Sequence, residues 1–343
     1  MEKYLITGFS GFVSQHLVSY LSQIKIRAEI IGVSRSKSSH YQYNNLNIKC
    51  REIDLKDAGK TIDLINETKP DYIIHLASDS SVAQSWHQPV TSFQNNTNIF
   101  LNLIESVRLS NISCRILSVG SSEEYGIVDS PILPLSENHQ LNPISPYAVA
   151  RVSQELLSKI YVQGYGMDII ITRSFNHIGP GQRDSFVISS FARQIVEIQH
   201  GKPHKIEVGN IDVVRDFLDV RDVVKAYVEL IEKGKKGEIY NICSGTGYSL
   251  KSILEKMIKM AGLDLNYSIN PKLVRPSDNP VIIGSNRKIR EQCNWKPEIS
   301  LEKSLGDILQ YWTTEINKEN KIPGCRGTHS YQPGTNYKIN SLQ

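Results

Sequence analysis

The stretch TGFSGFVS, residues 7–14, joins a short apolar run to a segment with helical periodicity. Gly8 permits a tight turn, and Gly11 lets the backbone approach a phosphate group at the N-terminus of the following helix. A full pattern would have three glycines at the spacing G-x-x-G-x-x-G, but the third position holds Ser14, which is small enough for close helix–strand packing. A turn that merely needs glycine is the structural alternative. The position between a strand and a helix at the start of the chain favours phosphate binding.

Apolar runs that predict strands alternate with amphipathic segments through the first half of the chain. Strands are predicted at 3–7, 28–33, 72–75, 115–119 and 168–172, and helices at 12–24, 61–68, 93–109 and 147–165. This alternation indicates a parallel sheet with helices on both faces. The expected fold is therefore α/β, a Rossmann-type doubly wound parallel sheet with a smaller α/β C-terminal lobe.

The character of the chain changes after residue 175, where Gly, Pro and Asn become frequent. We predict a dinucleotide-binding domain over 1–175, to which part of 210–245 returns, and a substrate lobe over 176–318. Residues 319–343 are predicted to form a tail, because most of them lack periodicity and are rich in Gly and Pro.

Composition limits the classes of function. The 343 residues are 40% hydrophobic and 22% charged, as in an ordinary globular protein, and the net charge of +4 is too small and diffuse to predict a nucleic-acid surface. No apolar run is long enough to span a membrane, and no secretion signal is visible. The five scattered cysteines argue against a disulfide framework and against a zinc site. We expect a cytoplasmic protein with no metal and no membrane or nucleic-acid partner.

The end of the second predicted strand informs the choice of cofactor. An acidic residue at this position would bind an unphosphorylated ribose, whereas Ser34, Arg35 and Lys37 can hold a 2′-phosphate. The sequence therefore favours NADP(H), with NAD(H) as the alternative, unless this is simply a solvated basic loop. Asp54, after the third strand, is placed to accept a hydrogen bond from an adenine amino group, or is a plain turn residue.

Three polar segments are expected to meet beyond the carboxyl ends of the strands, where ligands of open parallel sheets bind. They are residues 118–126, 147–151 and 176–182. Tyr147 and Arg151 are four residues apart on a predicted helix and so share one face. A phenol is a poor acid–base catalyst unless a nearby cation stabilises its phenolate form, and Arg151 supplies that charge. Ser121 is expected to share the hydrogen bond to the reacting oxygen. Taken singly, these residues also fit a helix-surface pair and a turn.

These motifs together resemble the extended short-chain dehydrogenase/reductases that act on nucleotide sugars. The resemblance covers residues 1 to about 315. The residues that carry it are TGFSGFV (7–13), HLAS (75–78), SVGSSEEYG (118–126), SPYAVAR (145–151), RSFNHIGPGQ (173–182), VRDFLDVRD (214–222) and RPSD (275–278). Within this family, the motifs are most similar to those of the GDP-4-keto-6-deoxy-D-mannose reductases, whose relatives are the GDP-mannose 4,6-dehydratases.

The resemblance implies roles for individual residues. Tyr147 would donate the proton to the sugar C4 oxygen, with Ser121 as its hydrogen-bonding partner and Arg151 beside it. The cofactor would contact Gly8, Ser10, Gly11, Phe12, Val13, Ser34, Arg35, Asp54, Leu55, Leu76, Ala77, Ser78, Tyr147 and Arg151. The substrate diphosphate would contact Asn176, Arg215 and Arg275, although each arginine alone also fits an ordinary surface position. Helices 93–109 and 147–165 would form the four-helix seam of a homodimer.

Two departures from the family pattern bear on the reaction. The family normally has Lys four residues after the tyrosine, where this chain has Arg151, and Ser14 replaces the third glycine. Glu123 occupies the position of the base in the dehydratases, or is simply a loop carboxylate. The neighbouring position, where the dehydratases often have an acidic Asp, holds Ser122. We predict reduction of a GDP-4-keto-6-deoxy-sugar at C4, giving GDP-D-rhamnose or a close analogue such as a GDP-heptose.

Two alternatives remain open. One is a 4,6-dehydratase, C4 dehydrogenase or epimerase of a GDP-sugar that uses bound NAD(P). The other is a non-catalytic dinucleotide sensor, which would be expected to have lost Tyr147 or the phosphate-binding arginines.

Overall fold

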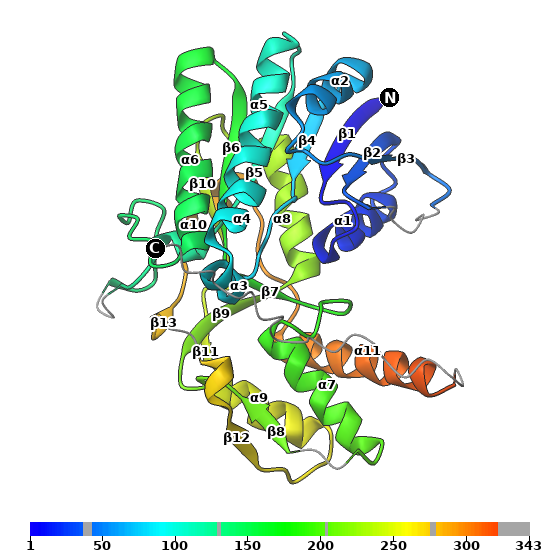
Figure 1. The fold of residues 1–343 in the computed structure, drawn as a ribbon, viewed down its shortest axis with the longest axis vertical. Coiled ribbons are helices and arrows are strands. Elements are labelled where there is room, and N and C mark those ends of the chain that lie inside the picture. The colour runs from blue at the N-terminus through cyan, green and yellow to red at the C-terminus, as the bar shows by residue number, and fades with distance from the viewer. Residues whose placement is uncertain (37–42, 129–131, 203–204, 275–278, 322–343) are drawn as a thin grey trace, which may run out of the picture.

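Seven parallel strands form the main sheet of the computed structural model, which describes residues 1–36, 43–128, 132–202, 205–274 and 279–321. Their order across the sheet is β10-β6-β5-β4-β1-β2-β3 (Figure 1). They span Glu2–Thr7 (β1), Ala28–Ser34 (β2), Leu46–Glu52 (β3), Tyr72–His75 (β4), Arg115–Ser121 (β5), Asp168–Ser174 (β6) and Ile239–Ile242 (β10). The order reverses between β1 and β4, so the topological switch point, where open α/β sheets generally bind ligands, lies at the carboxyl ends of these two strands. The predicted fold class is confirmed.

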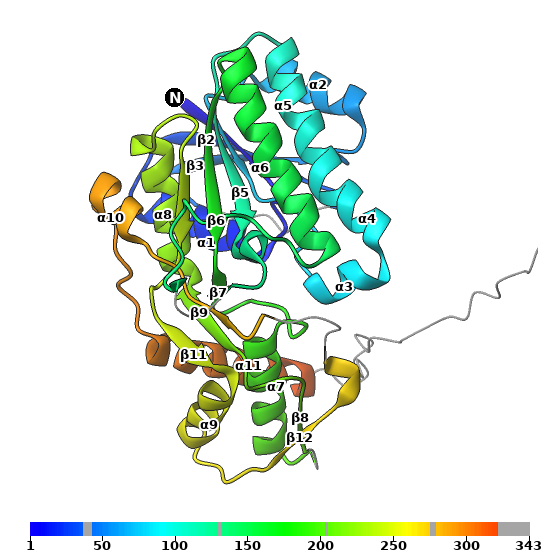
Figure 2. The same cartoon turned by 90° about the vertical axis from the view of Figure 1, so that its left-hand side faces the viewer.

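Helices cover both faces of this sheet (Figure 2). One face packs against α1 (Phe12–Gln23), α8 (Val220–Lys233) and α10 (Arg287–Cys293). The other packs against α2 (Ala58–Thr68), α5 (Ile99–Leu109) and α6 (Pro146–Tyr165). Because both faces are buried, the central strands are apolar almost without interruption, as parallel strands usually are.

The helix predicted at 93–109 was wrong at its N-terminal end. Helical structure begins earlier, with α3 (Val82–His87) and α4 (Pro89–Phe93), and a π-helical turn, η1 (Gln94–Asn98), separates α4 from α5. The side chain of Asn95 donates to Asp79, and that of Thr97 donates to the carbonyl of Ala150. These tertiary bonds compete with regular helix geometry, and Pro89 is well suited to a first helical turn.

A smaller lobe lies below the carboxyl ends of the main strands in Figure 1. Its core is built mainly from three helices that pack together, α7 (Val187–Gln199), α9 (Leu250–Met260) and α11 (Leu301–Lys321). Its short strands are β7 (Asn176–Ile178), β8 (Ile206–Val208), β9 (Val214–Asp219), β11 (Gly247–Ser249), β12 (Tyr267–Ile269) and β13 (Val281–Ile282). Helix α11 continues through residues 319–321, so the tail does not begin at residue 319 as predicted.

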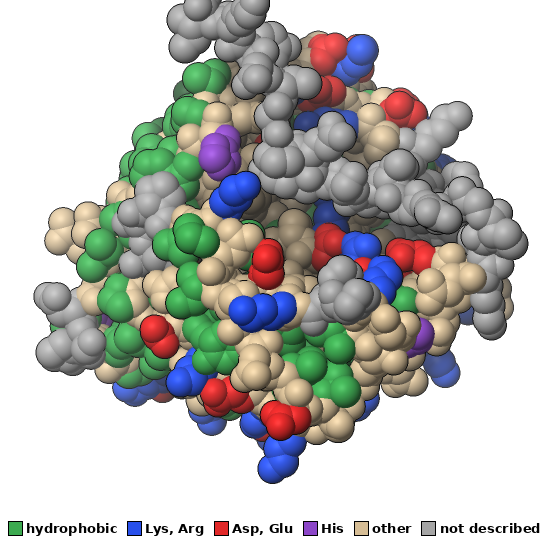
Figure 3. Space-filling view, turned by 60° about the horizontal axis from the view of Figure 1, so that its bottom comes forward, with side chains coloured by type: hydrophobic (Ala, Val, Ile, Leu, Met, Phe, Trp, Pro, Cys, Tyr) green, Lys and Arg blue, Asp and Glu red, His purple; other side chains and the backbone are tan. Residues whose placement is uncertain are grey.

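Acidic and basic side chains intermingle on the lower face of the molecule (Figure 3). Within the described ranges, no helix combines the length and the apolar character needed to cross a membrane.

Candidate active site

The loop between β1 and α1 has the geometry of a phosphate cradle. Gly8 has a φ of +67°, and a Cβ at this position would lie 2.9 Å from the Ala77 nitrogen. Gly11 is the N-cap of α1, and no side chain caps the helix there. The first N–H groups of α1 therefore keep free hydrogen-bonding capacity beside Ser10, Phe12 and Val13, which fits the diphosphate of a dinucleotide.

The Ser14 side chain binds backbone atoms of this loop. Its buried hydroxyl donates to the carbonyl oxygens of Phe9, at 2.5 Å, and Gly11, at 2.9 Å. A third glycine could not make these bonds, so Ser14 stabilises the turn as well as leaving room for close packing.

The residues predicted to bind the cofactor ribose lie at the ends of β2 and β3. Ser34 is buried and its hydroxyl donates to the carbonyl of Ser36 at 2.7 Å, whereas Arg35 is exposed and makes no ion pair with other described residues. Lys37 lies outside the described residues. Asp54 accepts from the backbone of Lys56 at 3.0 Å, as a turn residue does, and Leu55 beside it is buried.

Thr7 links β1 to the end of β4. Its hydroxyl oxygen accepts from the Ala77 N–H at 3.0 Å and is 3.0 Å from Nδ1 of His75. Burial, and then the charge of Arg151, lowers the pKa of His75 to about 3, so the imidazole is neutral. These bonds fix the HLAS segment, in which Leu76 and Ala77 lie against Gly8 and Ser78 follows them.

Tyr147 and Arg151 form the hydrogen-bonded pair expected from their spacing. Nε of Arg151 donates to the Tyr147 hydroxyl at 3.2 Å, and both side chains are buried. Nη1 of Arg151 also donates to the carbonyl of Val119 on β5 at 3.2 Å. This bond ties the pair on α6 to the strand that ends at Ser121.

The sequence analysis missed Gln154, which holds the arginine from the opposite side. Its Oε1 accepts from Arg151 Nη1 at 2.6 Å, and its Nε2 donates to Ser118 and Val119. The hydroxyl of Ser158 donates to Ser118 as well. Gln154 and Ser158 follow Arg151 by three and seven positions, a helical spacing that offered a signal.

Ser121 ends β5 and begins the short 3₁₀ helix η2 (Ser122–Tyr125). Its Oγ accepts from the Glu123 N–H at 3.2 Å, which leaves its own hydrogen available to donate to a ligand. Glu123 is half-buried, and its carboxylate makes no hydrogen bond or ion pair with another described residue.

The predicted diphosphate contacts belong to the small lobe. The Asn176 side chain donates to the Asp216 carbonyl at 3.4 Å, and Asn176 begins β7, which pairs with β9. Arg215 on β9 is buried, and its Nη1 donates to the Asn279 carbonyl at 2.6 Å. Arg275 lies outside the described residues.

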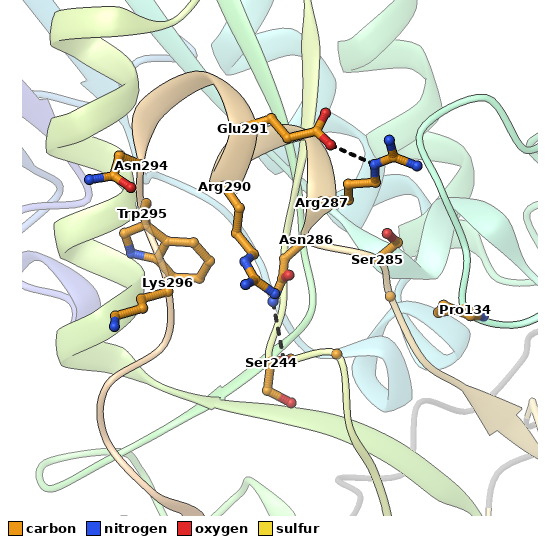
Figure 4. Close-up of a pocket in the computed structure, with 12 residues that line it drawn as sticks. Pro134, Ser244, Ser285, Asn286, Arg287, Arg290, Glu291, Asn294, Trp295 and Lys296 are labelled. Carbon is orange, nitrogen blue, oxygen red and sulfur yellow. Dashed lines mark hydrogen bonds and ion pairs between the residues drawn. The ribbon is translucent and has the colours of Figure 1, made fainter.

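A pocket of about 730 Å³ lies elsewhere, beside α10, and holds none of the predicted site residues. Figure 4 shows Asn286 bonded to Ser244, with Arg290, Trp295 and Lys296 also lining the pocket. Its side-chain chemistry includes no acid–base pair comparable to that of Tyr147 and Arg151.

Residues 5–308 match the model of the GDP-mannose 4,6 dehydratase family. The chain belongs to this family. Members are NAD(P)-dependent nucleotide-sugar enzymes, and the chain is accordingly an oxidoreductase of the extended short-chain dehydrogenase/reductase type, as predicted.

Three similar proteins illustrate the range of this family. The GDP-6-deoxy-D-mannose reductase of Pseudomonas aeruginosa is 34% identical over 319 residues, which cover 93% of this chain and 99% of the relative. The GDP-mannose 4,6-dehydratase of Yersinia enterocolitica is 26% identical, with 90% and 93% covered. The structure of RMD from Pseudomonas aeruginosa complexed with NADPH has a TM-score of 0.79 at 33% identity, covering 92% of this chain and all of that one.

Proposed function

We propose that the chain reduces the C4 ketone of a GDP-4-keto-6-deoxy-sugar with NADPH. The substrate would be GDP-4-keto-6-deoxy-D-mannose, giving GDP-D-rhamnose, or a close analogue such as a GDP-heptose. The observation that carries the proposal is the buried Tyr147–Arg151 hydrogen bond at the end of β5, in a chain similar along almost its full length to a GDP-6-deoxy-D-mannose reductase.

The residues fit NADPH as a cofactor, which when bound supplies the hydride for C4. The N-terminus of α1 would hold the diphosphate, and exposed Arg35 would bind a 2′-phosphate. The similar Pseudomonas structure holds NADPH, which supports this choice, with NAD(H) as the alternative.

Two hydroxyl groups would act on the C4 oxygen. Ser121 donates a hydrogen bond that polarises the ketone, since its oxygen already accepts from Glu123 N–H. Tyr147 would give its proton to the C4 oxygen of the reduced product, and Arg151 would stabilise the phenolate that is left. Proton exchange with solvent then restores the phenol. The sugar diphosphate would bind near Asn176, Arg215 and Arg275.

Glu123 favours a second candidate, a GDP-sugar 4,6-dehydratase. A dehydratase needs a base to remove the C5 proton, and the Glu123 carboxylate has no partner among the described residues that would occupy it. Such an enzyme would return its hydride to the product and consume no cofactor.

One experiment separates the two. The purified protein is given GDP-4-keto-6-deoxy-mannose with NADPH while nicotinamide absorbance is followed, and then GDP-mannose without added cofactor. Stoichiometric loss of NADPH in the first assay supports the reductase. A keto-sugar product in the second, with no net use of cofactor, would replace it with the dehydratase.

We also propose that the chain forms a homodimer through α6 and the neighbouring helical segment of α4 and α5. Helix α6 exposes Val149, Leu156 and Ile160 on one stripe, and neighbouring α4 exposes Val90 and Phe93. Apolar side chains gathered on adjacent helices favour burial against a second copy, and a two-fold axis would pair the stripe with itself.

A further inference from the structure

Glu124 lies in η2, three residues after Ser121, and no step of the proposed reduction uses it. The residue is 0% exposed, and its Oε1 accepts from the Ser121 N–H at 2.7 Å. The carboxyl group packs so closely on β5 that a Cβ at Gly120 would lie 2.6 Å from the same oxygen. Glu124 therefore fixes the backbone that carries the Ser121 hydroxyl.

The second oxygen of Glu124 is also buried, and it has no hydrogen-bond partner among the described residues. Its neighbour is the carboxylate of Glu155 on α6. Glu155 is already bound by Arg173, through Nε at 2.8 Å and Nη2 at 2.9 Å, and by Lys159 at 2.7 Å. The remaining Nη1 of Arg173 donates to the Glu137 carbonyl. The positive charges of this cluster thus bond to Glu155 rather than to Glu124.

Two neighbouring buried carboxyl groups resist double ionisation, because the second negative charge is neither hydrated nor far from the first. Burial, and then repulsion by Glu155, raises the pKa of Glu124 to about 8. Burial opposes ionisation of Glu155 too, but the hydrogen bonds and charge of Arg173 lower its pKa overall. The shared proton therefore belongs on Glu124.

We propose that Glu124 is a positioning residue, a carboxylic acid that keeps its proton at neutral pH, donates it toward Glu155 and holds the Ser121 backbone with its other oxygen. This bridge joins the end of β5 to α6, the helix that also carries Tyr147 and Arg151. Loss of the Glu124 proton places a second negative charge beside Glu155. The resulting repulsion displaces Ser121 from its position beside Tyr147 and Arg151. The role of Ser121 rests on the proposed function, whereas the protonation of Glu124 does not.

The sign of the pH effect follows from the raised pKa. The folded protein binds this proton more tightly than the unfolded chain does, so stability is lost as pH rises from about 4.5 through about 8. Glu124→Gln removes the titration, since its amide oxygen still accepts from Ser121 N–H and its NH₂ donates to Glu155. The variant should gain melting temperature relative to the parent as pH rises across this window.

The first test measures thermal unfolding against pH for the parent, Glu124→Gln and Glu255→Gln, an exposed substitution on α9 that serves as a matched control. We expect the difference between Glu124→Gln and the parent to grow toward alkaline pH, while the control follows the parent. A difference that does not change with pH would overturn the protonation of Glu124, whether or not the protein turns over any sugar.

The second test measures kcat and KM against pH with GDP-4-keto-6-deoxy-mannose and NADPH. Glu124→Gln should match the parent at neutral pH and keep its kcat at alkaline pH where that of the parent falls. Identical alkaline profiles would overturn the positioning role. Absence of turnover in the parent would instead overturn the proposed function and leave the unfolding result standing.

Discussion

Nε of Arg151 lies 3.2 Å from the hydroxyl of Tyr147, and no carboxylate among the described residues pairs with this arginine. Arg151 is only 4% exposed, and the other acceptors of its guanidinium, the Val119 carbonyl and the Gln154 amide, are neutral. A buried cation without an anion is costly, so the site gains most when negative charge develops on the phenol. The arrangement thus suits a tyrosine that gives up its proton.

Tyr147→Phe should lower kcat by about 10²–10⁴-fold, the usual contribution of a positioned acid–base group. The ring and its packing remain, so the affinity for NADPH, measured by fluorescence titration, should change little. The matched control is Tyr267→Phe, on β12 of the small lobe. Turnover close to that of the parent would remove Tyr147 from the proton-transfer step.

Arg151 should tolerate lysine better than an uncharged residue. Arg151→Met loses a charge-assisted hydrogen bond, worth about 1.5–3 kcal/mol, and should lower kcat by about 10–150-fold. Arg151→Lys keeps the charge but loses the bonds to Val119 and Gln154, which the planar guanidinium makes together. Its kcat should therefore lie between that of the parent and that of Arg151→Met. Steady-state kinetics on all three proteins, with circular dichroism to confirm folding, checks this order. Equal kcat values for Arg151→Lys and Arg151→Met would show that the site does not require the positive charge.

The sequence predicted much of this site because its signals are local. Tyr147 and Arg151 share a helix face by spacing alone, and Gly8 precedes a helix that begins at Phe12 as expected. Strand β4 was predicted with the bounds that the structure has, since a short apolar run between two turns defines both ends of the strand. The same locality explains why the alternation of elements was sufficient to predict a doubly wound sheet.

The missed features depend on contacts between distant segments. Gln154 bonds Arg151 within α6, but its link to Val119 exists only because β5 lies against that helix, and Glu124 matters only because Glu155 faces it from the same helix. The π-helical turn η1 likewise depends on a bond between Thr97 and Ala150. Helical spacing could have shown that Gln154 shares a face with Arg151, but it does not report contacts between α6 and β5, so the sequence indicated the segment around Ser121 and not the residues that hold it in place.

Arg35→Glu should shift the preference from NADPH toward NADH. The side chain is exposed at the end of β2, where a 2′-phosphate would meet it, and an acidic residue there would repel the phosphate and accept from an unphosphorylated ribose. Loss of the charge-assisted contact should raise KM for NADPH by about 10–150-fold, and KM for NADH should not rise with it. Arg287→Glu, an exposed arginine on α10, is the control. An unchanged ratio of kcat/KM for the two cofactors would place the 2′-phosphate elsewhere.

Ile160→Glu should dissociate the proposed dimer. The Ile160 side chain is 57% exposed and Leu156, on the same face of α6, is 49% exposed, so a carboxylate at Ile160 would be buried without a partner if a second copy covers this face. Sedimentation velocity of the parent should give the mass of two chains, and the variant should sediment as one. Ile269→Glu, at a similarly exposed position on β12 of the small lobe, should remain dimeric. A parent that sediments as a single chain would contradict the dimer, and an Ile160→Glu variant that stays paired would place the interface on another face.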